Sequence, residues 1–233
     1  MTPSNPIGVI DYGMGNLHSV RKALEVVGAK VKVSSSSEDI KKAKKIVFPG
    51  VGAFGEAMKE LKRRSLVQPI KDAIKAGTPF LGLCLGMQLL FEKSDEAPGI
   101  KGLCVLGGEV KRFKVKELKV PHMGWNNIAY GMEFQKLIPT TENRKIVIAK
   151  RFSCRLTAYN SKILKGVPNG SYMYFVHSYF VLPKDKNVIL TTTDYDINFM
   201  SGVCKDNIYG FQFHPEKSQA LGLKILKNFV DLK

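Results

Sequence analysis

The chain has 233 residues, of which 44% are hydrophobic, and this suits a single large domain, residues 1–233, with a substantial core. It shows neither a secretory segment nor an apolar run long enough to cross a bilayer, and its four cysteines lack paired spacing, so we expect a cytoplasmic protein without disulfides, metal or cofactor. The net charge of +16 comes from scattered lysines without interleaved aromatic residues, so we expect neither nucleic acid nor a membrane as a partner.

The first half of the chain alternates short apolar runs with amphipathic ones. A helix is predicted from Asn16, which can cap it, to Gly28, which can end it, because Leu17, Val20 and Leu24 share one face. Further helices are expected at 55–63, 66–76 and 87–92. Strands are expected at 7–11, 30–34, 45–48 and 78–84.

After about residue 100 the pattern changes to consecutive strands. These are expected at 103–106, 109–115, 171–181, 188–194, 199–204 and 208–214, and an amphipathic helix at 221–231 follows them. Alternation followed by consecutive strands predicts an α/β fold with an open, mixed and largely parallel sheet, flanked by helices and antiparallel in its second half.

A cysteine stands between the strand predicted at 78–84 and the helix that follows it. Gly82 and Gly86 flank Cys84, and this Gly-x-Cys-x-Gly pattern is the thiol counterpart of a nucleophile elbow. The glycines permit a sharp turn, and the start of the helix favours the thiolate. The backbone N–H of Leu85 is then expected to point at a developing oxyanion. Cys104, Cys154 and Cys204 lack such a frame and are interpreted as buried structural residues.

A second motif, Gln212-Phe-His-Pro-Glu-Lys217, follows the strand predicted at 208–214. If the chain stays extended there, His214 and Glu216 lie on the same side, so that the carboxylate can fix the tautomer of the imidazole. The ring can then accept a thiol proton. His18 and His122 have no such neighbour and are interpreted as ordinary surface or core residues.

Together these motifs resemble class I glutamine amidotransferases, and among them the glutaminase subunits of imidazole glycerol phosphate synthases. Five further segments carry the resemblance, in the expected order along nearly the whole chain. They are Ile10-Asp-Tyr-Gly-Met-Gly-Asn16, Phe48-Pro-Gly-Val-Gly-Ala-Phe-Gly55, Glu96-Ala-Pro-Gly99, Pro121-His-Met-Gly-Trp-Asn126 and Tyr174-Phe-Val-His-Ser-Tyr179.

The resemblance implies a glutaminase that acts through a Cys84, His214 and Glu216 triad. Its oxyanion would lie between the N–H of Leu85 and that of Val51 or Gly52. Its glutamine would be bound by Gly52, Gln88, Ser178 and Tyr179, with Glu96 pairing with the α-ammonium group; an ordinary surface carboxylate is the alternative for Glu96.

The resemblance also implies a heterodimer with a (β/α)8 barrel synthase. The barrel would use the ammonia to form imidazole glycerol phosphate and AICAR in histidine biosynthesis. Asn16, Trp125 and Lys217 are the candidate interface residues. Trp125 follows Met-Gly in a turn-like stretch, which favours a half-exposed anchor over a core aromatic.

One segment departs from the family pattern. The connection at 137–169 is longer than usual and is expected to be a surface segment. It leaves a second interpretation open, a paralogous glutaminase that supplies ammonia to another acceptor, such as a sugar in surface-glycan biosynthesis. Two further alternatives are a stand-alone thiol hydrolase of similar fold and a basic non-catalytic binding module, although the intact triad disfavours the latter.

Overall fold

A computed structural model describes residues 6–130 and 161–232. Over these ranges we find no helix with the length and apolar character that crossing a membrane requires. In the described part of the chain the main sheet has ten strands: β1 (Ile7–Ile10), β2 (Val31–Ser34), β3 (Ile46–Phe48), β4 (Phe80–Leu83), β5 (Lys93–Ser94), β6 (Gly108–Arg112), β9 (Tyr179–Pro183), β10 (Ile189–Tyr195), β11 (Ile197–Lys205) and β12 (Ile208–Phe211).

The sheet combines a parallel half with an antiparallel half. Its strand order is β2-β1-β3-β4-β12-β11-β9-β6-β5, with β10 paired to β11. The neighbours from β2 to β12 run parallel, whereas those from β12 to β6 run antiparallel. The predicted fold class is therefore confirmed. Because β1, β3, β4 and β12 are parallel neighbours, their carboxyl ends lie along one edge of the sheet, where open α/β sheets place their sites.

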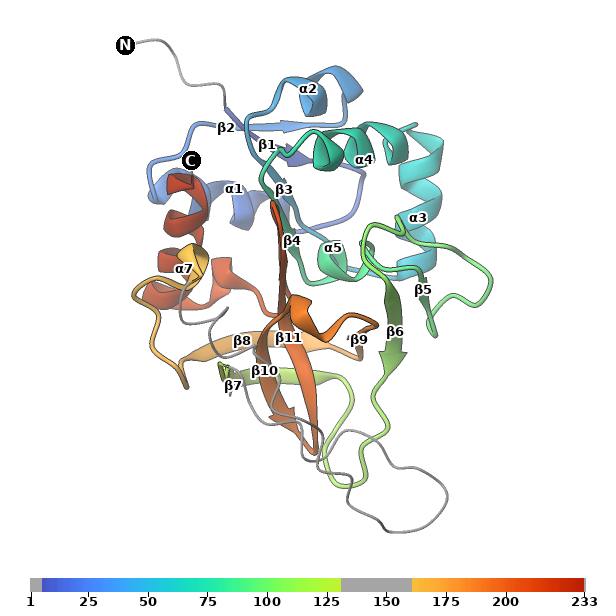
Figure 1. Ribbon diagram of the computed structural model, residues 1–233, viewed down its shortest axis with the longest axis vertical. Coiled ribbons are helices and arrows are strands. Elements are labelled where there is room, and N and C mark those ends of the chain that lie inside the picture. Colours follow the sequence, from blue (N-terminus) through green and yellow to red (C-terminus); the bar gives the residue numbers. More distant parts are fainter. Residues whose placement is uncertain (1–5, 131–160, 233) are drawn as a thin grey trace.

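Helices cover both faces of the sheet (Figure 1). One face packs against α1 (Leu17–Val26) and α7 (Gln219–Asp231), and the other packs against α2 (Ser37–Lys42), α3 (Phe54–Arg63), α4 (Val67–Lys75) and α5 (Leu85–Gln88). In α1, Val20, Ala23 and Leu24 form the buried stripe, since residues three and four apart share a helix face. The Asn16 side chain caps this helix by accepting from the N–H of Ser19 at 3.2 Å, as the sequence predicts.

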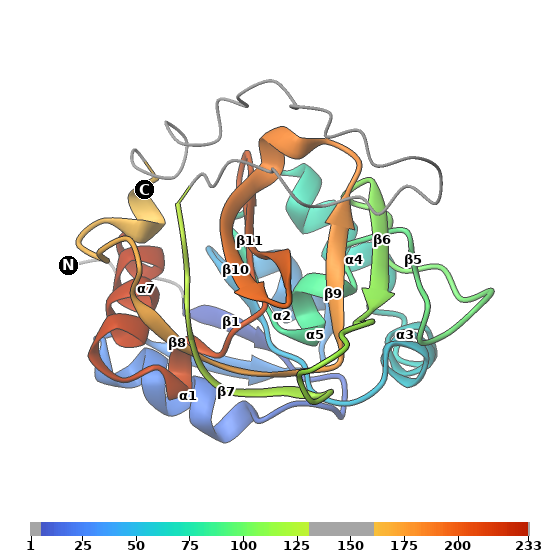
Figure 2. The same ribbon diagram turned by 90° about the horizontal axis from the view of Figure 1, so that it is seen from below.

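A separate antiparallel ribbon consists of β7 (His122–Asn127) and β8 (Tyr172–His177). It lies crosswise to β6 and β9 (Figure 2). Its side chains alternate, so that His122 and His177 are buried while Met123, Trp125 and Tyr172 are exposed. The turn-like interpretation of Trp125 is wrong in its secondary structure, because Trp125 lies within β7.

Several predicted boundaries differ from the structure. The strand expected at 103–106 is wrong, because the N–H groups of Leu103 and Val105 bond to carbonyls at Leu89 and Leu90 and pair with no strand. The helix expected at 87–92 is the four-residue α5. The strand expected at 171–181 is divided at Ser178 into β8 and β9, and the strand expected to reach His214 ends at Phe211.

The long connection lies mostly outside the described residues, which resume at 161. Its last part, 161–169, contains a short 3-10 helix, Lys162–Leu164, and the side chains of Ile163, Leu164 and Val167 are buried. The amide of Asn228 in α7 donates to the carbonyl of Ile163 at 2.9 Å. Residues 161–169 therefore pack into the core, and the prediction of a surface segment is wrong for them. For residues 137–160, which lie outside the described ranges, it stays a prediction.

Candidate active site

The cysteine motif and the histidine motif lie at the carboxyl edge of the parallel strands. Cys84 directly follows β4, and His214 lies three residues beyond the end of β12, the strand that pairs with β4 in parallel. The N–H of Cys84 donates to the carbonyl of Phe211 at 2.7 Å. Residues far apart in sequence are thus held side by side by the register of two central strands.

Cys84 has a backbone conformation that few residues other than glycine adopt. Its φ is 51° and its ψ is −111°, which marks a strained turn between β4 and α5. Gly86 allows this turn, because a Cβ there would lie 1.8 Å from the carbonyl oxygen of Phe48. The cysteine is buried, with 7% of its surface exposed. The predicted elbow is confirmed in its geometry.

The histidine and the carboxylate of the second motif are in direct contact. His214 Nδ1 lies 2.8 Å from Glu216 Oε1, and their side chains are 4% and 1% exposed. The chain is not extended here as the sequence suggested, because Pro215–Lys217 forms a 3-10 helix that brings the carboxylate back to the ring. Since Nδ1–H donates to Glu216, the proton on Nε2 is the exchangeable one. Nε2 makes no hydrogen bond with the described residues.

The charge state of His214 depends on Cys84. Burial alone lowers the pKa of His214, but the nearby Cys84 sulfur and the Glu216 carboxylate raise this pKa to about 10. The two partners stabilise the imidazolium more than burial destabilises it. At neutral pH the ring is therefore protonated.

A titration of His214 tests this electrostatic link. Cys84→Ala removes the sulfur that raises the pKa, and it leaves the opposing effect of burial in place. We therefore expect the pKa of His214 to fall well below its wild-type value of about 10, as measured by NMR of the ring nitrogens. An unchanged pKa in Cys84→Ala would mean that the two side chains do not act as a pair.

The loop after β3 passes directly over the start of α5. A Cβ on Gly50 would lie 2.8 Å from the backbone nitrogen of Gly86, so only glycine allows this approach. Gly52 has a φ of +98°, and Val51 is 40% exposed. The backbone of Val51 and Gly52 therefore lies in a glycine-rich loop beside the N-terminal end of α5, where Leu85 begins the helix.

Several of the predicted substrate-binding residues already make hydrogen bonds within the protein. The side-chain nitrogen of Gln88 donates to the carbonyl of Tyr179 and to Gln212 Oε1, both at 3.0 Å. Glu96 Oε2 accepts from the N–H of Phe54 at 2.7 Å, so it caps α3. Glu96 is partly exposed, and its pairing with the substrate's α-ammonium group stays a prediction. Ser178 is the break between β8 and β9, and Tyr179 is the first residue of β9.

Sequence reasoning missed two residues near Cys84. Gln212 is fully buried and its Nε2 donates to Cys84 Sγ at 3.5 Å. His177 is buried and its Nδ1 lies 2.8 Å from the carbonyl of Tyr179. Gln212 belongs to the histidine motif, two residues before His214. This position at the end of the same strand could have indicated that its side chain lies near Cys84. His177 stands in the segment Tyr174-Phe-Val-His-Ser-Tyr179, but no neighbour in that segment indicates its contact with the Tyr179 carbonyl.

The other cysteines differ from their predicted role in one case. Cys104 is exposed, so the expectation that it is buried is wrong; it has a φ of 54° in the irregular segment after β5. Cys204 is partly buried. Its pKa is raised to about 11, mainly by burial and to a smaller extent by the nearby charge of Asp206. Cys154 lies outside the described residues.

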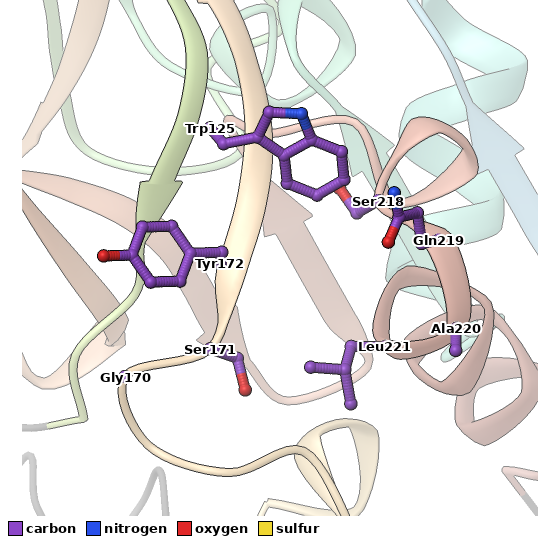
Figure 3. A pocket seen from close by; sticks show the side chains of 8 residues that line it. All are labelled: Trp125, Gly170, Ser171, Tyr172, Ser218, Gln219, Ala220 and Leu221. Carbon is purple, nitrogen blue, oxygen red and sulfur yellow. The ribbon is translucent and has the colours of Figure 1, made fainter.

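The three candidate interface residues lie on different elements. Asn16 caps α1, Trp125 is 46% exposed on β7, and the Lys217 ammonium lies 5.7 Å from the centre of the Tyr174 ring. Trp125 also lines a pocket of about 410 Å³, which begins at Ser218, next to the histidine motif. Tyr172 and Leu221 line the same pocket (Figure 3). The half-exposed position expected for Trp125 is confirmed.

Comparison with known proteins gives a consistent result. Residues 8–232 match the family Glutamine amidotransferase class-I. The chain is 47% identical to "Imidazole glycerol phosphate synthase subunit HisH" of Aquifex aeolicus, covering 95% of this chain and 94% of the relative. It is 40% identical to the protein of the same name from Moorella thermoacetica, covering 97% and 95%.

Solved structures share the fold at low sequence identity. A structure titled "Crystal structure of glutamine amidotransferase" aligns with a TM-score of 0.67 at 15% identity, covering 96% of this chain and 99% of the other. A chain of PurLQS from Thermotoga maritima aligns with a TM-score of 0.64 at 18% identity, covering 97% and 98%. At these identities the likeness supports the fold alone.

Proposed function

The chain belongs to the class-I glutamine amidotransferase family, and we propose that it hydrolyses glutamine as the glutaminase subunit of an imidazole glycerol phosphate synthase. The products are glutamate and ammonia, and the ammonia serves histidine biosynthesis. The observation that carries the proposal is the pairing of a positive-φ Cys84 with a buried His214–Glu216 contact of 2.8 Å at one sheet edge. The relatives at 40% and 47% identity, both named as this subunit, favour histidine biosynthesis over a glycan acceptor.

The first step is attack on the substrate's carboxamide carbon. The Cys84 thiolate forms the carbon–sulfur bond, and the electron pair of the carbonyl moves to its oxygen. The resulting oxyanion accepts hydrogen bonds from the N–H of Leu85 and from that of Val51 or Gly52. The strained turn places Cys84 directly before the first N–H of α5, as a nucleophile elbow requires.

The second step releases ammonia. As the tetrahedral intermediate collapses, the His214 imidazolium gives its Nε2 proton to the leaving nitrogen. His214 is then neutral and takes a proton from a water molecule, which attacks the thioester carbon. The carbon–sulfur bond breaks, and glutamate and the Cys84 thiolate are regenerated with His214 again protonated. Glu216 holds Nδ1–H throughout and stabilises the cation.

Glutamine binding is proposed at the surrounding residues. The backbone of Gly52, Ser178 and Tyr179 supplies hydrogen bonds to the substrate, and the carboxylate of Glu96 lies on the side of the α-ammonium group. Because Glu96 also caps α3 at Phe54, its orientation is fixed before substrate arrives. Gln88 contributes through its contacts with the Tyr179 carbonyl and Gln212.

The proposed partner is a (β/α)8 barrel synthase subunit, which forms a heterodimer with this chain. The barrel receives ammonia through a channel and forms imidazole glycerol phosphate and AICAR. Asn16, Trp125 and Lys217 are proposed as contacts with it. Support comes from the exposed indole of Trp125 and from Lys217, which directly follows Glu216 and links the interface to the catalytic pair.

The partner is also proposed to switch the glutaminase on, because uncoupled hydrolysis wastes glutamine. The loop Gly50–Gly52 can present a carbonyl or an N–H to the oxyanion, and one peptide flip completes the hole. We expect the isolated chain to hydrolyse glutamine slowly and to accelerate when a purified barrel synthase loaded with its nucleotide-like ligand is added. Glutamate release is measured with and without the partner.

The same assay separates this proposal from its alternative. Full glutamine turnover by the isolated chain, unchanged by the partner, contradicts the coupled subunit and favours a stand-alone hydrolase. A Trp125→Ala variant serves as a control, because it is expected to weaken activation by the partner while leaving the slow turnover of the isolated chain unaltered.

A further inference from the structure

A chain of hydrogen bonds runs beneath the β7–β8 ribbon. His177 Nδ1 lies 2.8 Å from the carbonyl oxygen of Tyr179, and His177 Nε2 lies 3.0 Å from His122 Nδ1. His122 Nε2 lies 3.3 Å from the amide nitrogen of Asn126. Both imidazoles are buried, with 6% and 3% of their surfaces exposed.

The carbonyl of Tyr179 sets the direction of this chain. A carbonyl only accepts, so His177 Nδ1 carries the hydrogen and donates it. In a neutral ring Nε2 is then the acceptor, so His122 donates to it from Nδ1 and accepts from Asn126 on Nε2. Burial lowers the pKa of His122 to about 4 and that of His177 to about 3, which keeps both rings neutral and preserves these tautomers.

The same carbonyl also orders the side chains next to the nucleophile. The Gln88 amide donates one N–H to Tyr179 and the other to Gln212 Oε1, both at 3.0 Å. Since the oxygen of Gln212 is thereby turned toward Gln88, its Nε2 faces Cys84 Sγ, at 3.5 Å. Because a thiolate only accepts hydrogen bonds, an N–H at this position is a charge-assisted donor to it.

We propose that His177 is a positioning residue whose Nδ1–H holds the Tyr179 carbonyl and thereby keeps the Gln88–Gln212 amide pair donating to the Cys84 thiolate. The inference rests on the proposed function, because it concerns the nucleophile of that reaction. It assigns a task to a buried imidazole pair that packing alone does not require.

The surroundings of the two rings support this assignment. His177 lies among Phe113, Phe175 and Phe199, with ring centres 5.2 to 5.7 Å away. An apolar side chain would pack in such a cage without the cost of burying polar nitrogens. The imidazole is therefore useful there for its hydrogen bonds, which form one connected network from β7 to Cys84.

Two substitutions at one position separate the hydrogen bond from packing. His177→Asn keeps an N–H where Nδ1 stood, whereas His177→Leu removes it with little change in volume. We expect His177→Leu to lower the alkylation rate of Cys84 by a neutral iodoacetamide probe by about tenfold, equivalent to roughly 1.4 kcal/mol, and to lower kcat rather than raise KM. His177→Asn should recover most of both rates.

The readout is mass spectrometry of the Cys84 peptide, with the exposed Cys104 in the same molecule as the internal reference. The exposed His18 supplies a matched control, because His18→Leu should leave both rates unchanged. The alkylation assay does not depend on glutamine turnover, so it tests the inference separately from the proposed function. A failure of the proposed function would show itself differently, as intact glutamine hydrolysis by the Cys84→Ser variant.

A second variant keeps the test decisive if His177→Leu fails to fold. Gln212→Leu removes the donor itself while leaving the His177–Tyr179 contact, and we expect the same loss of Cys84 alkylation. Where both variants fold, the double variant should lose no more than either alone. Wild-type alkylation in His177→Leu or in Gln212→Leu overturns the inference, and so does a His177→Asn variant as slow as His177→Leu.

Discussion

Replacing Cys84 with serine should lower the rate of glutamine hydrolysis by several powers of ten. The substitution replaces the attacking thiolate with a less nucleophilic hydroxyl, and Cys84, His214 and Glu216 are proposed to act together. The substitution changes one atom in a buried elbow and leaves the φ of 51° at this position to the surrounding turn. Glutamine binding should therefore persist. Glutamate release and glutamine binding by calorimetry are measured on the same preparation, in the presence of the synthase partner.

A matched control is available at the exposed thiol. Cys104→Ser removes a cysteine that, like Cys84, has positive φ but is exposed where Cys84 is buried. It should retain wild-type turnover. If Cys84→Ser kept near-wild-type hydrolysis, the nucleophilic mechanism would be wrong.

Loss of the imidazole should be nearly as damaging as loss of the thiol. His214→Ala removes the only side chain in the proposed mechanism that gives a proton to the leaving ammonia, and it also leaves the Glu216 carboxylate buried without its 2.8 Å partner. We expect the turnover of His214→Ala to fall by several powers of ten. Combining it with Cys84→Ser should add little further loss.

The carboxylate has a smaller expected effect. Glu216→Gln keeps a side-chain oxygen near Nδ1 and so preserves part of the orientation, but it removes the charge that helps to raise the pKa of His214 to about 10. Turnover should fall by less than in His214→Ala. Thermal unfolding curves of the variants check that each is folded. Unchanged activity in both His214→Ala and Glu216→Gln would refute the triad even with Cys84 essential.

The elbow was predictable because its requirements are local. Gly82, Cys84 and Gly86 stand within five residues, and the close approach of Gly86 to the Phe48 carbonyl follows from that sharp turn. The contact between His214 and Glu216 is equally local. The backbone conformation that makes this contact differs from the expected one, because Pro215 begins a 3-10 helix and the chain does not stay extended.

The network behind the nucleophile was not predictable from the sequence. Gln88, Tyr179 and His177 belong to α5, β9 and β8, and only the packing of these elements brings their polar atoms together. The apolar run at 103–106 shows the converse. It has the composition of a strand, but its N–H groups donate to carbonyls at Leu89, Leu90 and Phe91 after the short α5. Leu103 and Leu106 are therefore buried although the run pairs with no strand, and Cys104 between them is exposed.

The most direct test of the central claim is covalent capture of the nucleophile by an electrophilic glutamine analogue, followed by peptide mass spectrometry. The account predicts one modification, on Cys84, that glutamine suppresses and that disappears in Cys84→Ser. Cys104, Cys154 and Cys204 should remain unmodified, although Cys104 is exposed. Modification of another residue with loss of activity, or inactivation that leaves Cys84 unmodified, would contradict the account.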